Sequence, residues 1–158
     1  MPLLPWCARR LKRRWEAKGF VRYLGVDFGS ARTGLSLSDT TGLICRPLTV
    51  VVERDIEALI DRVLEYACRE DVGEIVVGLP RPLSGGTNAQ LEAADAFAGR
   101  LRERASMAVV TWDERFTSKL AESGRSPRTP ADAVAACYVL QNYLDAVHLK
   151  FERDQRSG

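Results

Sequence analysis

The 158-residue chain has a single histidine, no Cys-x-x-Cys pair and no long apolar run. Nucleophilic triads and zinc sites usually need histidine or paired cysteines, so the lone His148 argues against both. The longest apolar stretches, such as Ile75–Val77 and Ala133–Leu140, are far shorter than the roughly 18 to 20 residues of a membrane span. The sequence therefore predicts a soluble protein with no membrane partner.

The cysteines are few and widely separated: Cys7, Cys45, Cys68 and Cys137. This spacing indicates neither a disulfide framework nor a metal site, and we expect reduced, mostly buried thiols. A chain of this length buries roughly 70% of the surface that its unfolded form exposes. Folding should therefore require neither disulfides nor metal.

Acidic residues are scarce at the N-terminus, where residues 1–22 contain seven basic residues and one acid. The remaining 136 residues hold 16 basic and 20 acidic side chains, so the chain as a whole is not a polycation that coats nucleic acid. The basic segment would be a nucleic-acid-binding arm, a solvated surface helix or the remnant of an organellar targeting peptide. Composition does not separate these three interpretations.

Hydrophobic periodicity predicts three consecutive strands, followed by helices and strands in alternation. The expected strands are Tyr23–Asp27, Thr33–Ser38, Arg46–Val52, Glu74–Leu79 and Met107–Trp112. The expected helices are Asp55–Glu70, Asn88–Arg104, a short one at Thr117–Ser123 and a last one that starts at Thr129–Pro130. The order βββαβαβα predicts an α/β fold in which helices flank a five-stranded mixed sheet, an antiparallel meander extended by parallel strands.

The last helix has an apolar stripe that we expect to face the core. Its members are Ala133, Ala136, Leu140, Tyr143, Val147 and Phe151. We assign residues 23–150 to one domain, preceded by the basic extension 1–22 and followed by a polar tail, 151–158.

Acids fall where open α/β sheets place their ligands, at the carboxyl ends of strands. Asp27 ends the first strand, and Asp113 and Glu114 end the fifth. In an extended segment the side chains of Asp113 and Glu114 face opposite ways, so only one of them should point toward a ligand site at this edge. Asp132 lies in the first turn of the last helix, where it would either cap that helix or point toward the sheet.

Three carboxylates without a partner histidine suit a hard cation, Mg²⁺ or Mn²⁺. Such cations activate water and stabilise the attacking and leaving oxygens in phosphodiester hydrolysis. The alternative is that Asp27 only caps a turn. Its Gly-x-Asp-x-Gly motif is also not specific, because it occurs in sugar-kinase and actin-like folds. A small phosphotransferase of that class is a further candidate, although the chain is too short for its two lobes.

Four blocks stand out together: Leu24–Asp39, Val76–Pro80 with the Gly-rich loop behind it, Trp112–Ser118 and Asp132–Gln141. In this order and combination they closely resemble the YqgF/RuvX family, described as Holliday junction resolvases or pre-16S rRNA nucleases. The resemblance covers about residues 22–146. The segment between Ser118 and Asp132 looks shorter than the family usually shows.

The resemblance implies an RNase H-like fold and a metal-dependent endonuclease with Asp27, Glu114 and Asp132 as catalytic residues and metal ligands. It also implies that four basic residues contact nucleic acid: Arg32, Arg115, Lys119 and Arg128. Gly78 and the Gly85–Gly86 loop would let a nucleic-acid backbone approach, or would simply form a tight crossover turn.

The substrate would be a structured rRNA precursor or a branched DNA junction. A resolvase that cuts two strands symmetrically favours a homodimer, whereas an RNA-processing enzyme can be a monomer. The alternative function is a catalytically weak nucleic-acid-binding module whose affinity comes from the basic arm. We expect a cytoplasmic protein, or an organellar one if residues 1–22 are a targeting remnant.

Overall fold

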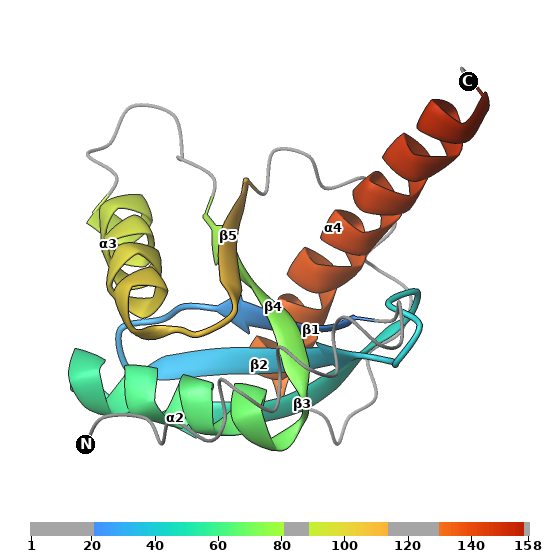
Figure 1. Cartoon of the computed structure of the whole chain (residues 1–158). Coiled ribbons are helices and arrows are strands. Elements are labelled where there is room, and N and C mark those ends of the chain that lie inside the picture. Colours follow the sequence, from blue (N-terminus) through green and yellow to red (C-terminus); the bar gives the residue numbers. More distant parts are fainter. Residues whose placement is uncertain (1–20, 81–88, 114–129, 157–158) are drawn as a thin grey trace.

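The structure is a computed structural model, and it describes residues 21–80, 89–113 and 130–156 (Figure 1). Its strands are β1 (Arg22–Asp27), β2 (Arg32–Ser38), β3 (Cys45–Val52), β4 (Val72–Leu79) and β5 (Ala108–Asp113). Its helices are α2 (Ile56–Arg69), α3 (Ala89–Arg104) and α4 (Ala131–Arg156). The predicted order of strands and helices is confirmed. The short helix predicted at Thr117–Ser123 lies outside the described residues.

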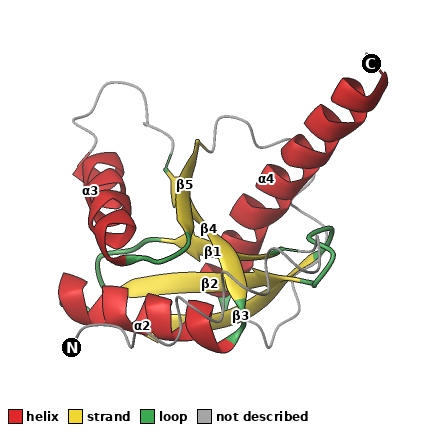
Figure 2. Ribbon diagram, viewed as in Figure 1, coloured by secondary structure: helices red, strands yellow, loops and turns green. Residues whose placement is uncertain are grey.

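The five strands form one mixed sheet with the order β3-β2-β1-β4-β5. Strands β1, β2 and β3 pair antiparallel, whereas β1 pairs with β4 and β4 with β5 in parallel (Figure 2). Proline cannot donate to a strand ladder, and Pro47 accordingly lies on β3 at the edge of the sheet. The predicted α/β fold with a meander and parallel strands is therefore confirmed.

Helices α2 and α3 cover one face of the sheet and α4 covers the other (Figure 1). On β1, Leu24 and Val26 belong to the core beneath α2 and α3, while Gly25 faces α4. The same alternation on β4 sends Val77 to the first core and Val76 to the second. Each side chain of the central strands can thus be assigned to one of two layers.

Helix α2 begins where the sequence predicts it. The Asp55 side chain accepts a hydrogen bond from the Ala58 backbone N–H at 2.8 Å and caps the helix. Helix α3 buries Ala94, Phe97, Ala98 and Leu101. The ring of Phe97 stacks on Phe28 with 4.8 Å between centroids, a contact that helical periodicity alone does not predict.

Glycines allow α4 to lie directly on the sheet. A Cβ atom added at Gly25 would come within 2.7 Å of the Leu140 Cβ, and one at Gly78 within 2.8 Å of a Val139 methyl group. Beside them, the Ser36 hydroxyl donates to the Ala136 carbonyl at 2.8 Å. Gly78 therefore has a packing role under α4, which the predicted tight turn or nucleic-acid approach did not include.

The apolar stripe of α4 is only partly buried. Ala133, Ala136 and Leu140 lie in the core, but Val147 is 37% exposed and Phe151 is 62% exposed. The prediction that these last two residues face the core is wrong, because α4 runs on beyond the sheet (Figure 1). The helix continues to Arg156, past residue 150 where we placed the end of the domain. No helix in the three described segments has the length and apolarity to span a membrane.

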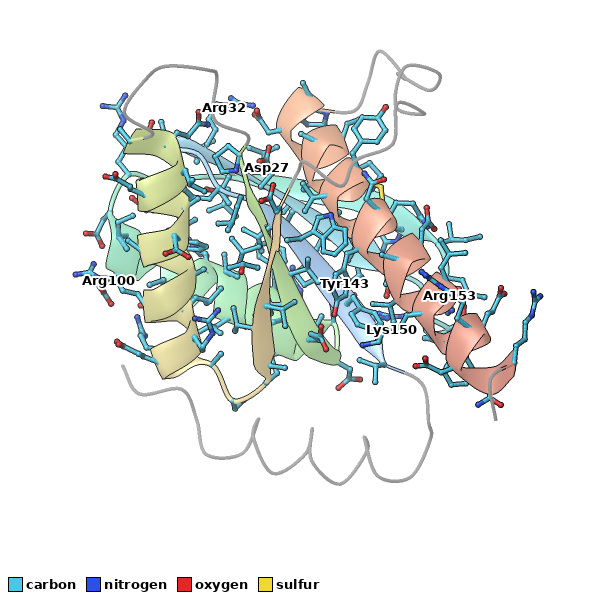
Figure 3. All side chains as sticks on the ribbon, turned by 90° about the horizontal axis from the view of Figure 1, so that it is seen from above. Asp27, Arg32, Arg100, Tyr143, Lys150 and Arg153 are labelled. Carbon is cyan, nitrogen blue, oxygen red and sulfur yellow. A yellow bond between two sulfur atoms is a disulfide. The ribbon has the colours of Figure 1, made fainter. Side chains whose placement is uncertain are left out.

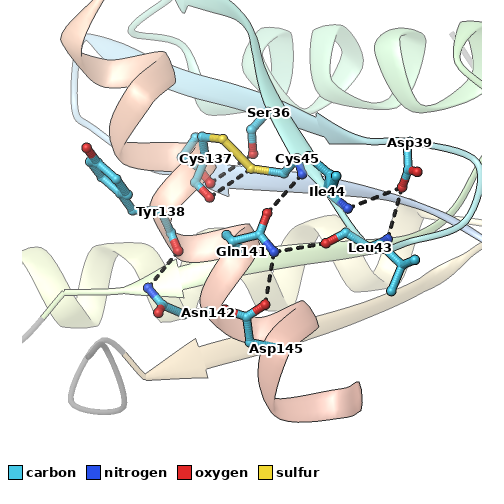
Figure 4. Close-up of a disulfide and its surroundings, with 11 residues drawn as sticks. Ser36, Asp39, Leu43, Ile44, Cys45, Cys137, Tyr138, Gln141, Asn142 and Asp145 are labelled. Atoms are coloured by element: carbon cyan, nitrogen blue, oxygen red, sulfur yellow. Dashed lines mark hydrogen bonds between the residues drawn. A yellow bond between two sulfur atoms is a disulfide. The ribbon is translucent and has the colours of Figure 1, made fainter. Parts of the chain in front are cut away.

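The prediction of reduced, mostly buried thiols is also wrong. Cys45 on β3 and Cys137 on α4 are both half-buried and form a disulfide, with 6.0 Å between their Cα atoms (Figure 4). No cysteine in the described part of the chain is a free thiol. The pairing joins residues 92 positions apart, which only the packing of α4 against the edge strand brings together.

Gln141 strengthens the same connection between α4 and β3. Its side-chain carbonyl accepts from the Cys45 backbone N–H at 3.0 Å, and its amide group donates to the Leu43 carbonyl at 2.9 Å (Figure 4). The disulfide and this amide together fix the first half of α4 to the start of β3 and the residues just before it.

Candidate active site

The carboxyl ends of β1, β4 and β5 meet at one edge of the sheet because these strands run parallel. Asp27 ends β1 and Asp113 ends β5, with Leu79 of β4 between them. Helix α4 starts at the same edge, near Asp27 (Figure 3). Asp132 in its first turn lies against Gly34, the β2 partner of Asp27. The sheet thus brings together acids that are far apart in the sequence.

Asp27 and Asp132 share one face of the sheet. On β1 the residues alternate, and Tyr23 and Gly25 contact α4, so Asp27 belongs to the α4 side as well. Directly across the ladder, a Cβ atom at Gly34 would overlap the Asp132 carbonyl oxygen. The sequence left two locations open for the Asp132 side chain, capping the helix or pointing toward the sheet, and this contact shows that its backbone lies against β2.

Asp132 is paired with Arg32, the first residue of β2. The Arg32 Nε donates to the Asp132 Oδ2 at 2.7 Å, and the two side chains are 56% and 37% exposed. The structure therefore places Arg32, predicted to contact nucleic acid, at the candidate site. Sequence reasoning missed the ion pair because its partners are 100 positions apart.

Strand β5 shows on which face Asp113 lies, the first of the two neighbouring acids between which the sequence left the choice open. Asp113 lies beside Leu79 in the ladder, and Leu79 packs against the core beneath α2 and α3. Trp112 lies beside Gly78 on the α4 side. Asp113 is therefore on the face opposite to Asp27 and Asp132.

Several predicted site residues lie outside the described residues. They are Glu114, Arg115, Lys119 and Arg128, together with Gly85 and Gly86 of the Gly-rich loop. The structure brings together Asp27, Asp132 and Arg32 from the predicted set.

The donor chemistry at this edge fits a hard divalent cation. Asp27 and Asp132 supply carboxylate oxygens, the ligand type that Mg²⁺ and Mn²⁺ prefer. Among the described residues there is no group of three or more His, Cys, Asp and Glu side chains that could hold a metal ion. The described residues thus offer two carboxylates at this edge of the sheet.

A third acid on the α4 face is part of the packing and lies away from the site. Glu74, near the start of β4, accepts a hydrogen bond from the Tyr143 hydroxyl. Burial raises the pKa of Tyr143, and the bond to Glu74 raises it further. Burial and the Glu74 charge also raise the pKa of Tyr23. Glu74, Tyr143 and Tyr23 form a cluster at the opposite end of β4 from the Asp27 edge. The sequence signal for this cluster was an acid in an otherwise apolar strand.

Comparison with known proteins gives a consistent result. A family model described as "RuvX: Holliday junction resolvase" matches residues 21–146. A protein of Moorella thermoacetica named "Putative pre-16S rRNA nuclease" is 38% identical over 133 residues, covering 79% of this chain and 95% of that protein. A protein of the same name from Anaeromyxobacter is 39% identical over 136 residues, with 81% and 99% coverage. Neither relative supports the organellar destination considered from the sequence.

Solved structures resemble the chain in fold. RuvC of T. thermophilus in complex with a Holliday junction substrate matches with a TM-score of 0.59 and 14% identity, over 81% of this chain and 96% of that one. The Fowlpox virus resolvase in complex with Holliday junction DNA matches with a TM-score of 0.51 and 10% identity, covering 80% and 99%. The RNase H-like fold expected from the sequence is confirmed.

Proposed function

Because this chain belongs to the RuvX family of Holliday junction resolvases, we propose that it is a nuclease that hydrolyses phosphodiester bonds in structured nucleic acid with a divalent cation. The observation that carries the proposal is the meeting of Asp27 and Asp132 on one face at the carboxyl edge of the sheet. Two carboxylates at this edge offer the hard oxygen ligands that Mg²⁺ or Mn²⁺ requires.

The third ligand in this proposal is Glu114. Asp113 lies on the α2 and α3 side of β5 and so faces away from Asp27. Glu114 is the next residue in the chain, and strand alternation would assign it to the same face as Trp112 and Asp27. The cation-binding set would therefore be Asp27, Glu114 and Asp132.

Each residue has a role in this proposal. The three carboxylates hold the cation, which when bound supplies charge stabilisation and an activated water. Arg32 pairs with Asp132, and Arg115, Lys119 and Arg128 follow β5 in the sequence. The guanidinium groups of the three arginines match phosphate oxygens in a bidentate way, and the ammonium of Lys119 is a point charge that also attracts phosphate, so these four residues would bind the nucleic-acid backbone.

The preferred substrate is a structured precursor of rRNA. The curated relatives at 38% and 39% identity are named for this activity, whereas the resolvase structures share only 14% and 10% identity with the chain. A branched DNA junction is the second candidate, because the family model is described by that substrate.

End-labelled precursor rRNA and four-way DNA junctions, each with Mg²⁺, Mn²⁺ or EDTA, test the proposal. Cleavage of one substrate by the wild-type protein should require the cation and be lost in Asp27→Asn and Asp132→Asn. Asp154→Asn is the matched control, since it changes an exposed acid at the far end of the same helix. Binding without cleavage by the folded protein would instead favour a nucleic-acid-binding module.

A further inference from the structure

The ion pair between Arg32 and Asp132 links the start of β2 to the first turn of α4, beside the end of β1. Arg32 precedes Gly34 by two positions, so it lies on the same face of the sheet as Gly34, the ladder partner of Asp27. Figure 3 shows Arg32 and Asp27 at the end of the molecule where α4 begins. The positively charged Arg32 side chain thus lies at the same edge as Asp27 and Asp132, the two carboxylates proposed as cation ligands.

The pair is open to solvent and engages each partner only in part. The Arg32 side chain is 56% exposed and the Asp132 side chain 37%. In the described part of the chain the contact runs from Nε to Oδ2, and the terminal nitrogens of Arg32 and Oδ1 of Asp132 have no hydrogen bond of their own. The guanidinium can therefore leave Asp132 without unfolding of the protein. Its terminal N–H groups can also donate to a second partner.

We propose that Arg32 is the resident counter-ion of Asp132, which opposes cation binding until a phosphate of the nucleic acid draws it away. The inference rests on the proposed function, because it takes Asp132 as a cation ligand. A guanidinium and a divalent cation compete for the same carboxylate charge, and they repel each other at short range. Without nucleic acid, Arg32 should hold the affinity for the cation below what the carboxylates alone would give.

Nucleic acid changes this balance through the unused donors of Arg32. A phosphate at this edge would accept from the terminal guanidinium nitrogens in a two-bond, charge-assisted contact, whereas the exposed pair with Asp132 has one bond. Asp132 would then be released to the cation. The consequence is cooperative binding, in which cation and nucleic acid each increase the affinity for the other.

Titration of the full-length protein with Mn²⁺, followed by the spin-resonance signal of the free ion, measures this competition without any cleavage. Exposed ion pairs have small interaction energies, so Arg32→Gln should bind Mn²⁺ about two- to fivefold more tightly than the wild type. Arg46→Gln removes an exposed arginine at the opposite end of the β2–β3 ladder and should leave the affinity unchanged. Asp27→Asn and Asp132→Asn should weaken Mn²⁺ binding.

A second titration in the presence of a structured RNA with 2′-O-methyl groups, which resists cleavage, tests the coupling. The RNA should increase the Mn²⁺ affinity of the wild type more than that of Arg32→Gln, because the variant has no counter-ion to release. Two results would overturn the role of Arg32 while leaving the proposed cation site intact. One is an equal increase of Mn²⁺ affinity by RNA in both proteins, and the other is a Mn²⁺ affinity that is unchanged or lower in Arg32→Gln. If the Mn²⁺ affinity is the same in Asp27→Asn and Asp132→Asn as in the wild type, or if no protein binds Mn²⁺, the proposed cation site is wrong and this inference fails with it.

Discussion

Gly34 of β2 lies directly against the backbone carbonyl of Asp132, so the first turn of α4 is seated on the ladder partner of Asp27. This contact sets the position of the helix that carries one proposed ligand relative to the strand that carries another. The absence of a side chain at residue 34 is therefore a requirement of the site as well as of the packing.

Substitution Gly34→Ala should displace the start of α4, because its Cβ would overlap the Asp132 carbonyl oxygen. We expect a loss of about 1 to 3 kcal/mol in the free energy of unfolding, measured by urea denaturation. Cleavage should fall more steeply than the folded fraction, since Asp132 moves with the helix.

Gly99→Ala is the control for this substitution. Gly99 is inside α3, and a Cβ atom there would have no neighbour within 4 Å. That variant should gain about 0.5 to 1 kcal/mol from helix propensity. A Gly34→Ala protein as stable and as active as the wild type would contradict the seating of α4 described here.

The disulfide between Cys45 and Cys137 should stabilise the fold, because it closes a loop between residues 92 positions apart. The double substitution Cys45→Ser and Cys137→Ser should lower the free energy of unfolding by about 2 to 5 kcal/mol. Serine variants isolate this bond better than a reductant, which would act on every disulfide of the chain. Equal urea midpoints for the variant and the oxidised wild type would show that the bond has no such role.

The Tyr143 hydroxyl should make stability depend on alkaline pH. Burial and the bond to Glu74 raise its pKa above the usual value of 10.0. Above about pH 10 the unfolded chain therefore loses this proton more readily than the folded one, and stability should decline as pH rises. Tyr143→Phe should flatten this decline in urea denaturation between pH 8 and 11, and an unchanged slope would argue against the assignment.

The two halves of α4 should differ in their contribution to stability. Leu144 is 1% exposed, and Leu144→Ala should cost about 2 to 5 kcal/mol. Phe151 is 62% exposed beyond the sheet, and Phe151→Gln should change the free energy of unfolding by less than about 0.5 kcal/mol. Thermal or urea unfolding of the two variants compares them directly. A large loss in Phe151→Gln would show that the end of the helix packs against a further surface.

Local patterns predicted the elements well because they depend on neighbours in the sequence. The spacing of apolar residues located α2, and Asp55 marked its start. The placement of Asp27 at the end of β1 followed from the same kind of pattern. These features are properties of short segments, so no knowledge of the tertiary structure was needed.

Contacts between distant residues were not predictable in the same way. The Cys45–Cys137 disulfide, the Phe28–Phe97 stack and the Arg32–Asp132 ion pair each join separate elements. The exposure of Phe151 has a related cause, since periodicity shows which side of a helix is apolar but not where the sheet beneath it ends. Sequence reasoning therefore located the candidate ligands but missed what surrounds them.

The most direct test of the central claim compares the two neighbouring acids that follow Trp112. Asp113 faces the α2 and α3 side of the sheet, so Asp113→Asn should retain cation-dependent cleavage of precursor rRNA or junction DNA within about tenfold. Glu114→Gln should lose at least about 100-fold, since a proposed cation ligand is removed. The opposite result, with activity lost in Asp113→Asn and kept in Glu114→Gln, would contradict an active site on the α4 face.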